Sequence, residues 1–185
     1  MRARELERLL TAHGVSPAKM DGVTRELRAS GRLPKGGRGT NAPRISPKEA
    51  ATTLIAVAGS SKANEANSRL DKLEPLRSSL PRKAPQTLID SLTAFLGDEA
   101  AFERLLEVRI ARTRRRASFH FRDGTVEEFL PAKPDGRRDR FYVEGILPAA
   151  LLQLVARAMD ESGDITGSGN RDARAINRSP GRGKS

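Results

Sequence analysis

The chain of 185 residues has a formal net charge of +11, 37% hydrophobic and 4% aromatic residues, and no cysteine. The lack of cysteine excludes a disulfide framework and a cysteine-based zinc site, and no apolar run approaches the roughly 18–20 residues that a membrane span needs. We therefore expect a cytoplasmic protein with a small core, no membrane partner, no metal and no cofactor.

The positive charge is unevenly distributed along the chain. Residues 1–58 carry eleven basic and five acidic side chains, whereas residues 59–105 carry seven of each. A local excess of this kind is typical of a surface that contacts a polyanion, although it could equally serve solubility. The sequence thus predicts a binding surface in the N-terminal part of the chain.

Residues 2–12 predict a first amphipathic helix, and the turn that follows is centred on Gly14. A second helix is predicted from Ser16, which can cap it, and Pro17, which suits the first helical turn. Its inward face holds Met20, Val23 and Leu27 at helical spacing. The two helices therefore form a compact pair with a polar outer surface.

The outer face of the second helix runs into a basic, glycine-rich segment, residues 35–40. A cationic helix face beside a cationic loop suits a polyphosphate, because the helix can enter a groove while the loop contacts phosphates. The side chains predicted to contact double-stranded DNA here are Lys19, Thr24, Arg25, Arg28, Arg32, Lys35, Arg38 and Arg44.

The same stretch resembles a known family. In helix-turn-helix proteins a glycine holds the turn and apolar residues follow one, six and nine places later, and Gly14, Val15, Met20 and Val23 match this pattern. Residues 27–40 also resemble the end of a recognition helix that runs into the wing of winged-helix repressors. The resemblance implies a helix-turn-helix DNA-binding domain at about residues 1–60.

The middle of the chain predicts a further helix and then a linker. Ser46 and Glu49 have the spacing of a capping box, which introduces a small apolar helix at residues 50–58 that can pack on the first two. A polar helix at residues 62–73 is followed by a proline-rich segment, so we expect residues 61–84 to be a helical linker.

Residues 85–161 predict a small antiparallel β-meander with a covering helix, so the expected fold class is α+β. A helix at 85–96 and a helical turn or two at 99–105 precede strands in which Leu106, Val108, Ile110, Phe119 and Phe121 alternate with polar residues. Asp123 and Gly124 predict a hairpin turn, and a bulge is expected near Glu127 and Glu128. A short strand at 141–143, a closing helix at 147–159 and a disordered basic tail at 162–185 complete the prediction.

Two polar clusters of this second domain are candidate sites. The loop at residues 112–116 could place Arg114, Arg115 and Arg116 on a phosphate backbone, or could simply protect a sheet edge from pairing. An acidic set, Asp123, Glu127 and Glu128, could suggest a nuclease, but a turn explains Asp123 and the adjacent glutamates should point to opposite faces. We therefore predict no catalytic residue.

The function predicted from the sequence is sequence-specific binding of double-stranded DNA by a transcriptional regulator of phage or mobile-element type. The protein would not be an enzyme. Its second domain would supply homo-oligomerisation or contact with another protein. Two alternatives remain open: a small terminase-like subunit of phage DNA packaging, and an RNA-binding accessory protein.

Overall fold

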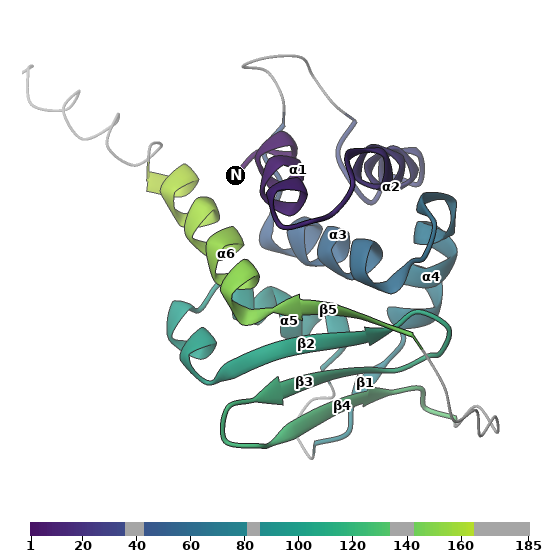
Figure 1. The fold of residues 1–185 in the computed structure, drawn as a ribbon, viewed down its shortest axis with the longest axis vertical. Helices are drawn as coiled ribbons and strands as arrows, with labels where there is room; N and C mark the ends of the chain where they lie inside the picture. The colour runs from purple at the N-terminus through teal and green to yellow at the C-terminus, as the bar shows by residue number, and fades with distance from the viewer. Residues whose placement is uncertain (36–42, 81–85, 134–142, 165–185) are drawn as a thin grey trace, which may run out of the picture.

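The computed structural model describes residues 1–35, 43–80, 86–133 and 143–164. These residues form six α-helices and one five-stranded antiparallel sheet (Figure 1), which confirms the predicted α+β class. None of the helices in these four ranges has both the length and the apolar character needed to cross a lipid bilayer.

The helices are α1 (Ala3–Ala12), α2 (Pro17–Ala29), α3 (Pro47–Gly59), α4 (Ala66–Leu73), α5 (Leu88–Leu96) and α6 (Ala149–Asp164), with short 3-10 helices η2 (Ala63–Glu65) and η3 (Glu99–Glu103). The strands are β1 (Arg77–Ser78), β2 (Leu105–Ala111), β3 (Ala117–Phe121), β4 (Val126–Leu130) and β5 (Glu144–Pro148). They lie in the order β1-β4-β3-β2-β5.

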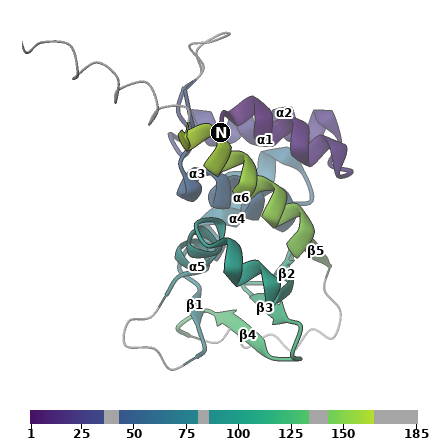
Figure 2. The ribbon, with the colours of Figure 1, turned by 90° about the vertical axis from the view of Figure 1, so that its left-hand side faces the viewer.

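Helix α3 is the centre of the molecule, between the α1–α2 pair and the sheet (Figures 1 and 2). From Ala50 to Gly59 its side chains are apolar apart from two threonines, and all of these residues are buried. A helix that is apolar all round must be buried. The predicted capping box is confirmed: Ser46 Oγ accepts a hydrogen bond from the Glu49 amide, and the Glu49 carboxylate accepts one from the Ser46 amide at 2.6 Å.

One hydrophobic cluster runs from Met1 to Ala156 and includes residues of every helix. The helix predicted at 62–73 is confirmed as η2 and α4. The prediction that this region is a linker is wrong for its described residues, because Leu70, Leu73 and Leu76 are fully buried in this cluster. The prolines near residue 80 predict an extended connection, but the helix that precedes them packs against α2 and α3.

The sheet follows the predicted meander, with one change of register. Gly124 turns the β3–β4 hairpin with a φ of +86°, as predicted. The bulge predicted near Glu127 and Glu128 is absent, because β3 and β4 pair without interruption. The irregularity lies instead between Leu105 and Glu107 of β2. That shift leaves Leu106 50% exposed, so the prediction that it lies in the core is wrong. On β4, Val126 faces outward and Glu127 takes the inward position.

The C-terminal elements also begin later than predicted. The expected strand at 141–143 lies largely outside the described residues, and β5 starts at Glu144. Leu147 belongs to β5, not to the closing helix, which runs from Ala149 to Asp164 and therefore includes the first three residues of the predicted tail. The remainder of that tail lies outside the described residues.

Candidate nucleic-acid interface

The α1–α2 unit forms as its sequence predicts. Gly14 turns the chain with a φ of +93°, a conformation that suits glycine. Ser16 Oγ then caps α2 by accepting a hydrogen bond from the Lys19 amide at 3.3 Å. Met20, Val23 and Leu27 are buried, so the inward face of α2 is confirmed.

Two residues predicted on the outer face of α2 point inward instead. Thr24 is 2% exposed, and its hydroxyl donates to the Met20 carbonyl at 3.0 Å. Lys19 reaches the C-terminal end of α3, where its Nζ donates to the Ser60 carbonyl at 2.7 Å. Burial lowers the pKa of Lys19, and the nearby charge of Arg112 lowers it further. The prediction that both face outward is therefore wrong.

The two arginines in the middle of α2 are paired with acids. Arg25 is 74% exposed and forms an ion pair with Asp21, one helical turn earlier, at 3.1 Å. Arg28 pairs with Glu7 of α1 at the same distance and is two-thirds covered. An exposed pair of the Arg25 kind is weak and can open to admit another anion. Arg25 is thus the α2 cation most available to a ligand.

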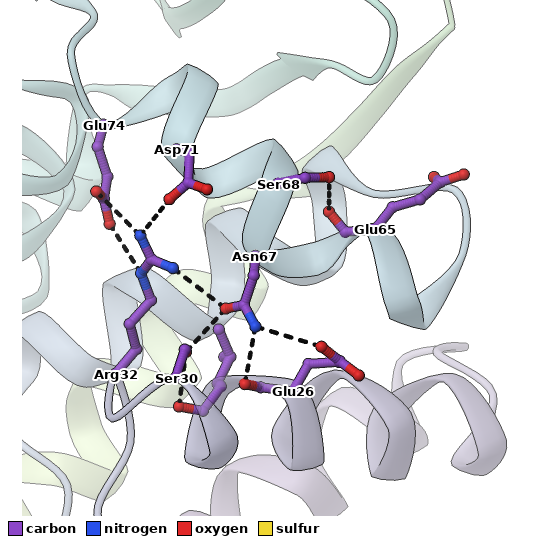
Figure 3. A network of polar contacts seen from close by, with 9 residues as sticks. Glu26, Ser30, Arg32, Glu65, Asn67, Ser68, Asp71 and Glu74 are labelled. Carbon is purple, nitrogen blue, oxygen red and sulfur yellow. Dashed lines mark hydrogen bonds and ion pairs between the residues drawn. The ribbon is translucent and has the colours of Figure 1, made fainter.

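Arg32 closes a polar network between the end of α2 and α4 (Figure 3). Its guanidinium donates to Asp71 at 2.7 Å, to Glu74 at 3.1 Å and to Asn67 at 3.2 Å. Burial opposes its charge, but the hydrogen bonds that it donates to Glu74 and Asp71 outweigh this and raise the pKa of Arg32. The structure thus gives this predicted DNA contact a role in fixing α4 to α2.

The basic loop at 112–116 lies against the rest of the protein. Arg112 Nε donates to the Ala58 carbonyl at 3.1 Å, and the carbonyl of Arg114 accepts a hydrogen bond from Arg69 at 2.8 Å. Arg116 pairs with Glu128 across the β3–β4 ladder, and Arg114 and Arg115 are partly buried. The loop therefore packs against the protein and does not project as a cationic tip.

Lys35 and Arg44 remain exposed, on either side of the segment that holds Arg38, which lies outside the described residues. Arg44 is placed by a backbone bridge to Arg2, and the Ile45 amide donates to the Met1 carbonyl at 3.1 Å. The N-terminal ammonium is close by: burial lowers its pKa, and Arg44 adds to this against the effect of Glu5.

Two exposed cations of α1, Arg4 and Arg8, were not predicted as site residues. They line a shallow groove between α1 and α2, together with Glu7 and Asp21. Their spacing of four residues, on the face opposite Leu6 and Leu10, was the signal in the sequence that could have identified them. We call Arg4, Arg8, Lys35 and Arg44 the N-terminal basic surface.

No other described residue forms an ion pair with any member of this surface. Acids in the same region have other partners: Glu7 pairs with Arg28, and the Glu5 carboxylate accepts a hydrogen bond from the Arg2 amide at 2.7 Å. Four exposed cations that have no carboxylate partner among the described residues are available to bind a polyanion.

The acidic cluster does not converge. Glu127 is 1% exposed and accepts a hydrogen bond from Ser78 at 2.5 Å, whereas Glu128 pairs with Arg116 on the other face of the sheet. Asp123 accepts a hydrogen bond from the Thr125 amide, which lowers the pKa of Asp123. Within the described ranges no group of three or more histidine, aspartate or glutamate side chains could hold a metal ion.

These features define an α+β protein with a cationic surface at its N-terminal helices. Comparison with known proteins adds no relative: no family model matches the chain, and no curated protein or solved structure is significantly similar to it.

Proposed function

We propose that the protein binds double-stranded DNA through its N-terminal basic surface and acts as a cytoplasmic transcriptional regulator of phage or mobile-element type. The observation that supports DNA binding is the set of four exposed cations, Arg4, Arg8, Lys35 and Arg44, without ion-pair partners in the described chain. Phosphate contacts by such side chains supply most of the sequence-independent affinity for duplex DNA.

The α1–α2 unit suits this role because its two helices form one end of the molecule (Figures 1 and 2). Arg25, exposed on α2, is the side chain best placed to approach bases once the basic surface holds the backbone. The role of regulator follows from the resemblance of residues 14–23 to helix-turn-helix proteins.

A second copy of the chain is part of this proposal. The face of the sheet away from the helices exposes Val126 on β4 and Ile146 on β5, beside an ion pair between Arg109 and Glu107 on β2. Apolar side chains on an open sheet face can pair with a copy of themselves. Binding of two DNA sites by a dimer would multiply the modest affinity of one basic surface.

Removal of two cations from the surface tests the proposal. The double variant Lys35→Ala, Arg44→Ala should raise the Kd for a duplex of about 20 base pairs by roughly tenfold or more at ~100 mM salt, because two phosphate contacts are lost. Fluorescence anisotropy with a labelled duplex measures the change.

The matched control is Arg104→Ala, Arg122→Ala. It removes the same charge from exposed arginines near the β3–β4 turn, at the end of the molecule opposite α1 and α2 (Figure 1). Its Kd should stay within about threefold of the parent protein, as expected for a change in long-range field alone. An equal loss of affinity in both variants would mean that net charge, and not this surface, holds the DNA.

A further inference from the structure

A groove of about 520 Å³ is lined by the turn between α1 and α2, the end of α3, β5 and the start of α6. In Figure 1 the turn between α1 and α2 lies above β5 and the start of α6. Its apolar lining includes Leu10, Val15, Val57, Leu147 and Leu151. Small-molecule sites are commonly concave, mostly apolar and of this size, with a few polar groups that fix orientation.

Two cations lie in this groove, Lys19 and Arg112. Both form hydrogen bonds with the C-terminal end of α3. Lys19 Nζ donates to the Ser60 carbonyl at 2.7 Å, and Arg112 Nε donates to the Ala58 carbonyl at 3.1 Å. Each bond uses one donor, whereas an ammonium carries three and a guanidinium five. Anchored cations with further donors are a preorganised receptor for an anion.

The charges around the groove favour an anion. Among the described residues that line it there is no aspartate or glutamate. The pKa of Lys19 lies below its ordinary value, first because burial disfavours the ammonium and then because Arg112 repels it, while Glu65 compensates only in part. A bound anion would lie close to two like charges and relieve their repulsion.

We propose that this groove binds a small amphipathic carboxylate, whose head group lies between Lys19 and Arg112 and whose apolar body covers Leu147 and Leu151. The polar head accepts hydrogen bonds from the two cations, and the body loses its contact with water against the leucines. The site shares no residue with the N-terminal basic surface, so it does not depend on DNA binding.

Octanoate and octanol test this inference on the full-length protein, because they share an alkyl chain and differ in the charge of the head group. Isothermal titration calorimetry at pH 7 should show saturable binding of octanoate, with a Kd at least about tenfold lower than that of octanol. NMR should also show the pKa of Lys19 rising when octanoate is bound. Absence of saturable octanoate binding, or equal affinity for octanol, would overturn the proposal.

A variant at the rim of the groove gives an independent test. Ala150 lines the groove and is exposed in the first turn of α6, so Ala150→Glu should fold while adding a carboxylate to the groove lining. It should weaken octanoate binding by about tenfold or more, whereas the uncharged control Ala150→Gln should stay within about threefold of the parent. Unchanged octanoate affinity in Ala150→Glu would overturn the proposal.

Discussion

Replacement of Arg69 by methionine is expected to lower the free energy of unfolding by about 3–4 kcal/mol. Arg69 is 7% exposed and donates to three backbone carbonyls: Gly59 at 3.2 Å, Ala111 at 2.6 Å and Arg114 at 2.8 Å. Methionine fills a similar volume but donates nothing. The three carbonyls would then remain in a dry site without partners, at a cost of roughly 1–3 kcal/mol for each buried group that finds no water.

The contacts of Arg69 explain why the effect should be global. They connect α4 with the last residue of α3 and with the end of β2, so one side chain joins the helical layer to the sheet. Burial lowers the pKa of Arg69, with partial compensation from Glu65, but an arginine stays charged in proteins.

Lys72→Met is the control, since Lys72 is an exposed residue of the same helix. Urea unfolding followed by circular dichroism measures both variants, and the control should stay within about 0.5 kcal/mol of the parent. Similar stability for the two variants would show that water replaces the guanidinium and that the junction does not depend on it.

Replacement of Gly145 by alanine should cost about 3 kcal/mol, the upper end for overpacking. Gly145 lies on β5, and a Cβ atom there would overlap the Ala58 backbone of α3, first of all its carbonyl oxygen. That oxygen belongs to a helix backbone and cannot rotate away as a side chain would. The added methyl must therefore push α3 and β5 apart, which opens the core between them.

Gly97→Ala is the matched control for Gly145→Ala. A Cβ atom at Gly97 would lie 3.7 Å from the nearest atom outside its chain neighbours, which is ordinary contact. Thermal unfolding should show a clearly lower Tm for Gly145→Ala and little change for Gly97→Ala. A Gly145→Ala protein as stable as the control would mean that α3 and β5 are not packed at the distance described.

Local sequence signals predicted the elements of this fold well. Ser16 and Ser46 cap the helices that follow them, and Gly124 turns the predicted hairpin. These signals act over a few residues, so they can be read without knowledge of the tertiary structure. The sequence predicts the bulge on β4 and not on β2, because a bulge depends on both strands of a pair and the sequence shows only their hydrophobic pattern.

The roles of the cations were harder to predict, because the partner of a long side chain is set by distant segments. In the sequence Lys19 and Arg32 look like exposed cations, just as Arg25 does. Their partners, however, are Ser60 and the acids of α4, about forty positions away in the chain. No local pattern shows that Arg69 is buried either, because the three carbonyls that accept its hydrogen bonds are brought together only by the fold.

The most direct test of the central claim is the salt dependence of duplex binding by the full-length protein. Log Kobs should fall linearly with log salt concentration between about 50 and 200 mM, with a slope of roughly −3 to −5, as expected when four or five cations displace counterions from the phosphates. Lys35→Ala, Arg44→Ala should make that slope less steep by about 2. No duplex binding at ~50 mM salt, or a slope near zero, would contradict the proposed DNA-binding surface.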